Sequence, residues 1–209
     1  MPSDRVAGGA SIPALLGFDT SGGWCRAALI RGPVLLASRN EAMARGQGER
    51  LMPLLEQVLA EAGLGWHDLA ALGVGVGPGN FTGIRISVAA ARGLALGLGI
   101  PAVGVSRFDA LALDGPALPV LVAAPRRQGW LQRPGAAPVL CDIAALEGPV
   151  IADPADYPAA TPPVWPLAEA IARIACACYT TPQPRPAPIY LREADAAPPS
   201  GAPPALIDP

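Results

Sequence analysis

The sequence predicts an α/β fold in which three antiparallel strands are followed by alternating helices and strands. Short apolar runs separated by glycine turns fill residues 14–39, which is typical of a β-meander. Apolar residues at helical spacing then follow in Glu49–Ala62. Hydrophobic residues make up 51% of the 209 residues, so the chain can bury the core of one compact domain or two small ones.

The meander is predicted from three apolar runs. Ala14–Phe18 and Trp24–Ile30 are expected to be strands joined by the tight turn at Gly22 and Gly23. Val34–Arg39 is the third expected strand, after a turn that contains Gly32 and Pro33. Consecutive strands joined by such short turns must run antiparallel.

A helix is predicted over Glu49–Ala62, because its leucines recur at intervals of three and four residues. Pro53 is tolerated early in a helix, where its missing N–H costs least. Leu72–Val76 is expected to be a buried strand. It leads through a glycine-rich turn into a second helix, Thr82–Leu98.

This second helix carries a stripe of small residues. Ile86, Ala90, Gly93 and Gly97 fall on one side at helical spacing. Each glycine inside a helix costs about 1 kcal/mol relative to alanine, so two of them indicate that something approaches this side closely. The sheet of the same chain and a helix of another chain both satisfy this requirement.

The next elements complete the first half of the chain. Ala102–Val105 is expected to be a strand, and Ser106–Leu113 a short helix with Ser106 as its N-cap. Residues 13–113 therefore read as three strands followed by alternating helices and strands. By analogy, this pattern is typical of a ribonuclease-H-like lobe, which occurs in each half of the actin-like ATPase fold.

The composition changes after residue 113, because 20 of the 26 prolines lie in residues 114–209. Strands are expected at Leu118–Ala123, Gln128–Arg133 and Ile189–Arg192, and a helix at Pro166–Tyr179. Residues 15–24 align loosely with residues 121–130. We therefore predict a second, reduced lobe over 114–197, with a disordered leader at 1–12 and a loose tail at 198–209.

Composition excludes several functional classes. The formal net charge is −2 with no basic patch in either half, so we do not expect this chain alone to bind nucleic acid. The four cysteines lack the spacing of a disulfide framework or a zinc site, and His67 is the only histidine, so no metal site is expected. Arg92 and Pro101 interrupt the apolar stretch 86–105, which argues against a membrane span. No signal peptide is recognised, and we expect a cytoplasmic protein.

Two segments are candidates for nucleotide or phosphate binding. Asp19 and Thr20 follow the first strand, where an acidic residue and hydroxyls can position magnesium and phosphate. Asp19 can instead cap its own turn, and we favour this alternative. Gly77 and Gly79 lie in a turn that can present N–H groups to an anion. This turn lacks the lysine of a P-loop, so we favour a structural or protein-contact role without excluding phosphate.

Several motifs together resemble the bacterial TsaB (YeaZ) family, which is related to TsaD and other glycoprotease-like proteins. The resemblance is densest over residues 14–113. It rests on the strand that ends in Asp19-Thr-Ser, the segments 48–55, 91–101 and 103–106, and the closing segment 188–196. Its most specific part is Gly75-Val-Gly-Pro-Gly-Asn-Phe-Thr-Gly-Ile-Arg85.

The resemblance implies the actin-like fold and a role in threonylcarbamoyl transfer to N6 of adenosine 37 of tRNA. It implies a non-catalytic subunit that binds and stabilises a TsaD-like paralogue as a heterodimer, is joined by a TsaE-like ATPase, and forms a homodimer when alone. Contact with tRNA would then occur only through the complex. The two helices of the first lobe would form the interface, which gives as candidate residues Glu49, Arg50, Met52, Pro53, Arg85, Ile86, Ala89, Ala90, Gly93 and Gly97.

Two alternatives remain beside this hypothesis. The chain could be an ATP-binding actin-like domain that uses Asp19, Thr20, Gly77 and Gly79, or, with less support, a glycoprotease-type peptidase. The segment 124–127 reads Ala-Pro-Arg-Arg where the family often has an acidic residue, which weakens a nucleotide site between the lobes. We therefore expect no catalytic residue and no cofactor of this chain's own, with ATP and magnesium bound mainly by partners in the complex.

Overall fold

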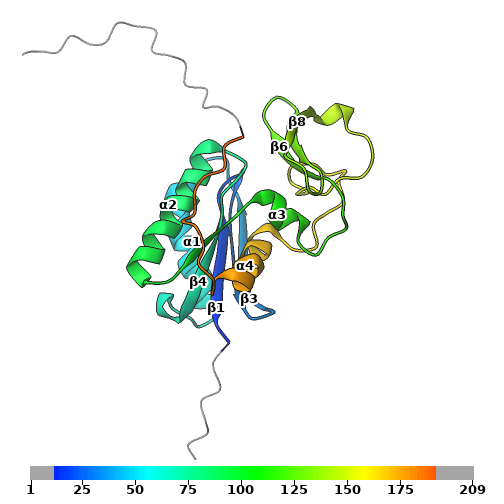
Figure 1. Ribbon diagram of the computed structural model, residues 1–209. Coiled ribbons are helices and arrows are strands. Elements are labelled where there is room, and N and C mark those ends of the chain that lie inside the picture. The colour runs from blue at the N-terminus through cyan, green and yellow to red at the C-terminus, as the bar shows by residue number, and fades with distance from the viewer. Residues whose placement is uncertain (1–11, 192–209) are drawn as a thin grey trace, which may run out of the picture.

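The computed structural model describes residues 12–191. Its first sheet has five strands in the order β3-β2-β1-β4-β5 (Figure 1). Strands β1 to β3 are antiparallel, whereas β4 and β5 run parallel to β1. The strands are β1 (Ala14–Asp19), β2 (Trp24–Arg31), β3 (Val34–Ala42), β4 (Leu69–Gly75) and β5 (Ala102–Val105). This order and polarity confirm the predicted ribonuclease-H-like lobe of the actin-like fold.

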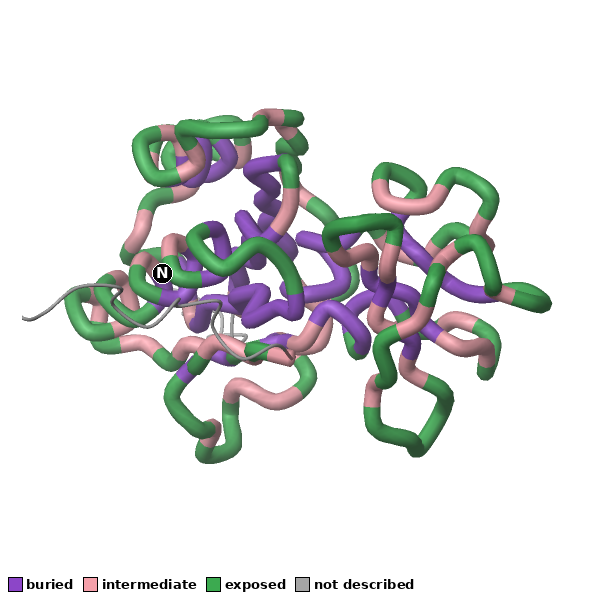
Figure 2. The backbone as a smooth tube through the Cα atoms, turned by 90° about the horizontal axis from the view of Figure 1, so that it is seen from above, coloured by how far each residue is buried: buried purple, intermediate pink, exposed green. Residues whose placement is uncertain are grey.

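Helices cover both faces of this sheet (Figure 1). Helices α1 (Gln47–Glu61) and α2 (Phe81–Leu98) lie on one face, where their apolar sides enclose Leu16, Phe18 and Leu72. Helices α3 (Arg107–Ala112) and α4 (Leu167–Cys178) lie on the other face. Alternate residues of each strand point to opposite faces, so the same strands supply both cores. Figure 2 shows the buried residues concentrated in this part of the molecule.

The second sheet is a smaller meander in the order β6-β7-β8. It comprises β6 (Val120–Ala124), β7 (Gln128–Gln132) and β8 (Val139–Asp142), all antiparallel. Single parallel bridges join Val120 to Ile151 and Ile151 to Thr161. These two bridges occupy the places that β4 and β5 hold beside β1 in the first sheet. The second sheet therefore repeats the strand pattern of the first sheet in a smaller form.

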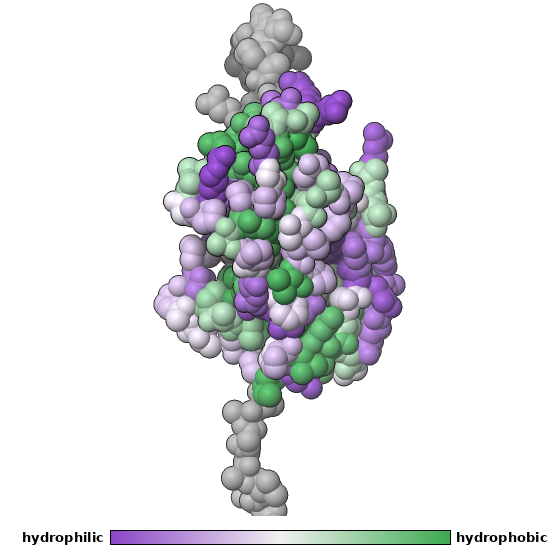
Figure 3. Space-filling view, turned by 90° about the vertical axis from the view of Figure 1, so that its right-hand side faces the viewer, coloured by the Kyte–Doolittle hydropathy of each residue, from purple (hydrophilic) through white to green (hydrophobic). Residues whose placement is uncertain are grey.

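The surface of the second lobe is mixed in character. Val139 and Leu140 of β8 are exposed. Seen from the side on which this lobe lies, however, the hydrophobic surface is broken up by polar residues (Figure 3). The second lobe contributes a small core of its own, centred on Leu121, Leu131, Val150 and Ala152.

The chain returns to the first lobe after the second sheet. Helix α4 packs across β1, β2 and β4, and the following segment runs along α2 (Figure 1). Packing therefore groups α4 with the first sheet, whereas the sequence analysis grouped these residues with the second lobe. The backbone carbonyl of Ala168 lies so close to Gly17 of β1 that a side chain there would overlap it.

Most predicted elements agree with the structure to within a few residues. Ser106 caps α3 as predicted, because its hydroxyl accepts from the Asp109 N–H at 3.0 Å. The predicted strand Ile189–Arg192 is wrong for its described part, since Ile189 to Leu191 form no ladder. The Ile189 N–H donates instead to the carbonyl of Val76, just after β4, at 2.8 Å, and the Ile189 side chain packs against the first core. Prolines at 182, 184, 186 and 188 remove alternate N–H donors from the approach to this segment.

Two ion pairs join the lobes. Arg26 of β2 contacts the carboxylate of Asp153, and both side chains are 9% exposed. Arg107, the first residue of α3, donates from Nη2 to Asp156 at 2.6 Å. The ring of Trp24 lies against both guanidinium groups, at 3.8 Å from that of Arg26 and 5.0 Å from that of Arg107. These buried contacts connect the first sheet to the loop 153–156 of the second lobe.

Candidate functional site

The turn after β1 is built around the side chain of Asp19, which is fully buried. Its Oδ1 accepts from the Ser21 N–H at 3.0 Å, from the Ser21 hydroxyl at 2.9 Å and from Trp24 Nε1 at 2.9 Å. Oδ2 has no hydrogen-bond partner among the described residues. Asp19 thus caps its own turn, and its carboxylate is enclosed by Trp24 and β4.

The glycine-rich turn packs directly against this first turn. The Thr20 hydroxyl donates to the carbonyl of Gly83 at 2.6 Å, and the Asn80 N–H donates to the carbonyl of Ser21 at 2.6 Å. A β-carbon at Gly79 would overlap the carbonyl of Ser21, and one at Gly83 would overlap that of Thr20. Glycine is required at these positions because two backbone segments approach this closely. These glycines therefore serve the packing of strand ends.

The outer side of α2 is exposed, although Ala89 borders a shallow hollow that Pro188 of the returning segment also lines. Ala89, Gly93, Leu96 and Gly97 are exposed, and Leu96 is 84% exposed. A β-carbon at Gly93 or Gly97 would meet no atom within 4 Å outside its own stretch of helix in residues 12–191. The side of α2 that packs on the sheet is instead lined by Gly83, Ile84, Ser87, Val88 and Ala91. For Gly93 and Gly97, the chain's own sheet is thus excluded as the close neighbour, whereas Ile86 and Ala90 of the predicted stripe pack partly against the core.

The predicted interface residues of α1 lie beside α2. Ile86 of α2 is half-buried, and its Cδ1 is 3.8 Å from the β-carbon position of Gly48. Glu49 and Pro53 are exposed, whereas Met52 is partly buried against the core. Arg50 is held within the chain by Glu41, with Nε at 2.7 Å and Nη2 at 2.6 Å from the carboxylate oxygens. This hydrogen bond lowers the pKa of Glu41.

A cluster at the start of α2 was not predicted. The Arg85 guanidinium lies 3.7 Å from the centre of the Phe81 ring, and its Nε donates to the Tyr190 hydroxyl at 2.9 Å. The rings of Phe81 and Tyr190 are 5.0 Å apart. Arg85, a predicted interface residue, therefore fastens the returning segment to α2. The one signal in the sequence was the Tyr-Leu-Arg motif of the closing segment. This motif does not indicate that Tyr190 packs against α2.

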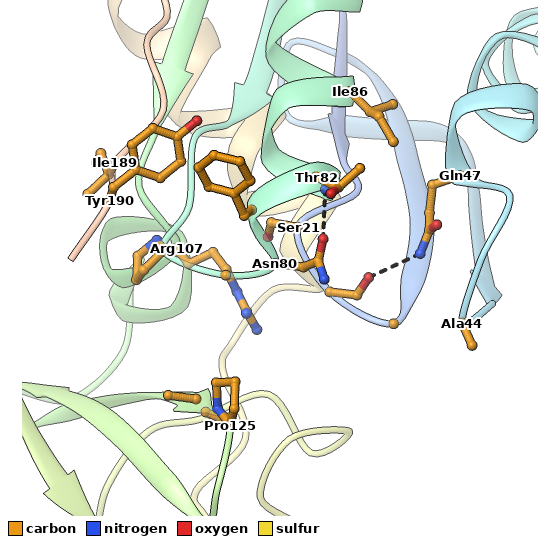
Figure 4. A pocket seen from close by; sticks show the side chains of 18 of the residues that line it. Ser21, Ala44, Gln47, Asn80, Thr82, Ile86, Arg107, Pro125, Ile189 and Tyr190 are labelled. Atoms are coloured by element: carbon orange, nitrogen blue, oxygen red, sulfur yellow. Dashed lines mark hydrogen bonds between the residues drawn. The ribbon is translucent and has the colours of Figure 1, made fainter. Parts of the chain in front are cut away.

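Between the lobes lies a cleft of about 1190 Å³. It is lined by the turns at 21–23 and 44–49, the start of α2, the end of β6 and residues 189–191 (Figure 4). Asp19, Thr20 and Gly77 do not line it, whereas Gly79 does. The structure therefore does not bring the four predicted phosphate residues together around this cleft. The charged residues that do line it are Arg45, Glu49 and Arg107.

The structure does not place His67 or the cysteines among the residues that line the cleft. No three histidine, cysteine, aspartate or glutamate side chains within residues 12–191 are grouped to hold a metal ion. His67 lies in a short 3-10 turn, Trp66–Asp68. Burial raises the pKa of the Cys25 thiol to about 11, and burial also raises the pKa of Cys141 and Cys178. Thiols with raised pKa values are poor nucleophiles.

By length and composition, α2 is also the one described helix that could cross a membrane. One such helix is weak support for a span. Its inner side packs on the sheet through Ile84, Ser87 and Val88. Its outer side carries the exposed Gly93 and Gly97.

Comparison with known proteins agrees with this architecture. A family model described as TsaD, tRNA N6-adenosine threonylcarbamoyltransferase, matches residues 40–127. The Haemophilus influenzae tRNA threonylcarbamoyladenosine biosynthesis protein TsaB is 39% identical over 99 residues, which cover 47% of this chain and 41% of that protein. An uncharacterized Mycobacterium tuberculosis protein is 33% identical over 208 residues, covering 90% of this chain and 95% of that protein.

A solved structure described as YeaZ from Pseudomonas aeruginosa has the same fold, with a TM-score of 0.67 and 24% identity. The match covers 86% of this chain and 100% of that one. By contrast, the matched region spans less than half the length of the H. influenzae TsaB protein. The chain belongs to the TsaB (YeaZ) family.

Proposed function

We propose that this chain is a subunit of the machinery that makes threonylcarbamoyladenosine in tRNA, and that it binds and stabilises a TsaD-like partner without catalysing the transfer itself. The TsaB relative is named for this biosynthesis, and the matching family model describes the transferase. The observation that carries the proposal is the open, glycine-bearing side of α2 beside α1. The partner would supply the catalytic residues, and the complex would contact the tRNA in the cytoplasm.

The outer side of α2, together with the adjacent part of α1, forms a helical face whose shape suits close packing against another helix. Ala89, Gly93 and Gly97 are small and exposed, so a partner helix can approach the backbone of α2. Leu96 adds an apolar side chain that water surrounds in the isolated chain. A stable interface of this kind buries about 1,200–2,000 Å² in total. The two helices together offer a continuous surface for such a partner.

The decisive experiment is co-purification of the full chain with a co-expressed TsaD-like protein. Gly93→Leu and Ala89→Arg add bulk or charge to the open side and are expected to abolish co-purification. Circular dichroism and thermal melting should show that both variants stay folded, because Ala89 is exposed and a β-carbon at Gly93 would meet no atom within 4 Å outside its own stretch of helix. Ala145→Arg is the matched control, since Ala145 is exposed on the second lobe. Undiminished capture of the partner by both variants would refute the proposed surface.

The further members of the complex follow from the same proposal. A TsaE-like ATPase would join the heterodimer and bring ATP and magnesium with it, and the isolated chain would pair with itself through the same helical face. Sedimentation analysis of the isolated chain tests the last point. The dimer should dissociate in Gly93→Leu, whereas a dimer that persists in this variant must use another surface.

The alternative of an ATP-binding domain that uses Asp19 has less support. Asp19 is enclosed by Trp24 and Ser21 and does not line the cleft. Calorimetry with ATP and magnesium discriminates between the two functions. Binding that is lost in Asp19→Ala would favour the alternative.

A further inference from the structure

The helical face carries four exposed charges, two on each helix. They are Arg85 and Arg92 of α2 and Glu49 and Glu56 of α1. None of the four forms an ion pair within residues 12–191. The charges of α2 are thus both positive and those of α1 both negative, and all four are available to another molecule.

The two arginines lie on the side of α2 that borders the returning segment. Arg85 donates from Nε to the hydroxyl of Tyr190, and this segment runs along α2 (Figure 1). Both arginines line a shallow hollow of about 390 Å³, whose other members are Val88, Ala89 and Pro188. Neither α2 nor residues 179–191 contain an acidic residue. We call this side of α2, from Arg85 to Arg92, the basic margin.

The two carboxylates lie on the outer side of α1. Glu49 follows Gly48, whose β-carbon position faces α2. It precedes Arg50, which Glu41 of β3 holds on the opposite flank of the helix. Because consecutive residues of a helix are rotated by about 100°, Glu49 points outward between these two flanks. Glu56 lies on the same outer side, about two turns further along.

The acidic and basic pairs match in spacing and in level. Arg85 and Arg92 are seven residues apart, which is about 10.5 Å along a helix. Glu49 and Glu56 have the same separation. Both helices begin at the interlobe cleft, so they run in the same direction. Gly48 contacts the residue of α2 that follows Arg85, which places Glu49 within about 3 Å of the level of Arg85.

We propose that the basic margin of α2 is the docking site for α1 of a second copy of this chain, so that Glu49 of each copy pairs with Arg85 of the other. Glu56 pairs with Arg92 in the same way. A two-fold axis along the outer side of α2 carries each α1 over the opposite basic margin and keeps the levels of the charges. The exposed Gly93 lets the two copies of α2 approach closely at this axis. The inference rests on the proposed self-association through the helical face and names the charges that set its register.

Charge reversal in the full, isolated chain tests this register. Arg92→Glu replaces an attraction by a repulsion on both sides of the axis, so the dissociation constant of the homodimer should rise about tenfold or more in sedimentation analysis. Glu56→Arg should weaken the dimer to a similar extent. The double variant Arg92→Glu/Glu56→Arg rebuilds both pairs with exchanged signs, and its dissociation constant should return to within about threefold of the native value.

Matched controls are available on the second lobe. Arg133→Glu and Glu147→Arg make the same charge changes at exposed positions there and should leave the dimer unchanged. Thermal melting should show that Arg92→Glu and Glu56→Arg stay folded, since both positions are exposed and unpaired within residues 12–191. An unchanged dissociation constant in Arg92→Glu, or a double variant that dimerises no better than the single ones, would overturn the proposal.

Co-expression with the TsaD-like protein separates this inference from the proposed function. A native chain that captures this protein but is monomeric in isolation would overturn the inference and leave the proposed function standing. A homodimer that follows the charge reversals in a chain that captures no TsaD-like protein would support the inference and refute the proposed function. If Arg92→Glu lost only the capture and dimerised like the native chain, the basic margin would bind an acidic segment of the partner, which would also overturn the inference.

Discussion

The two faces of the first sheet differ in where their glycines lie. On one face, α4 lies so close to the sheet that glycines are required beneath it. A β-carbon at Gly73 would be 2.8 Å from the carbonyl of Ile171, and one at Gly17 would be 2.6 Å from the backbone nitrogen of Ala172. On the other face, Gly93 and Gly97 lie on the outer side of α2, where the described chain places nothing against them.

This difference shows that glycine has two uses in one sheet domain. Beneath α4, glycine removes a steric conflict within the chain. The conformational entropy that glycine loses on folding is offset by the close packing of α4 on the sheet. On α2, the same residue brings no benefit to the isolated chain and lowers helix propensity. A helix that keeps such residues exposed is suited to contact with another molecule, which is the basis of the proposed partner surface.

The closed face gives the largest expected effect. Gly17→Val would force the added carbons against the backbone of α4, which cannot yield without moving the whole helix. We expect a loss of more than about 3 kcal/mol in the free energy of unfolding, or failure to fold. Urea denaturation measures it. Gly23→Ala is the control, because Gly23 is exposed with no atom within 4 Å, and a change within about 0.5 kcal/mol is expected. Similar losses in both variants would contradict the comparison.

The ion pair that joins the closed face to the second lobe gives the next effect. Asp153→Asn leaves the Arg26 guanidinium buried without its counter-charge, so we expect a loss of about 3 kcal/mol in the free energy of unfolding. Glu61→Gln is the control, since it breaks the more exposed Arg39–Glu61 pair and should cost less than about 1 kcal/mol. Equal costs would mean that the lobe junction is not a buried pair in solution.

The pH dependence sharpens this second prediction. Burial raises the pKa of Asp153, but the hydrogen bond and charge of Arg26 outweigh burial and hold the pKa below its ordinary value of 3.8. A carboxylate with a lowered pKa stabilises the fold above its unfolded-state pKa, and this contribution is lost as the pH falls through the folded-state pKa. The stability difference between the native chain and Asp153→Asn should therefore be constant at neutral pH and shrink below about pH 4. A difference that grows in acid would contradict it.

The open face gives the smallest effect, and one of opposite sign. Gly93→Ala should raise the free energy of unfolding by about 0.5–1 kcal/mol, because alanine favours the helix and its methyl group meets no neighbour. Chemical denaturation of the monomeric chain measures it. A clear loss of stability would show that this side of α2 is already in contact within the chain.

The elements of the first lobe were largely predictable from local patterns. The helical spacing of Leu51, Leu54, Leu55, Val58 and Leu59 marks the buried side of α1, and all five are buried, whereas Ala62 of the same predicted side is the half-buried C-cap. Glycine turns marked the strand ends. Ile189 was mispredicted as a strand residue because an apolar run shows β propensity but not whether a neighbouring strand is available.

The candidate site was less predictable. Arg107 fell within the predicted short helix Ser106–Leu113 and was not singled out. Its position two residues after β5, at the carboxyl end of a parallel strand, was the signal that could have placed it at the cleft, since clefts of α/β sheets lie at this edge. Asp19 was easier to interpret from its local sequence. A turn cap was favoured there over a phosphate site, and Ser21 and Trp24 donate to its carboxylate within the turn.

The sequence by itself determined the periodicities, the glycine turns and hence the order of strands and helices in the first lobe, because these depend on residues close in the chain. The tertiary structure alone decided which glycines are covered, that α4 returns to the first sheet, and that Arg107 faces the start of α2. Those outcomes depend on contacts between residues far apart in sequence, such as Gly17 with Ala172 and Arg107 with Asp156. Local patterns carry no information on such distances.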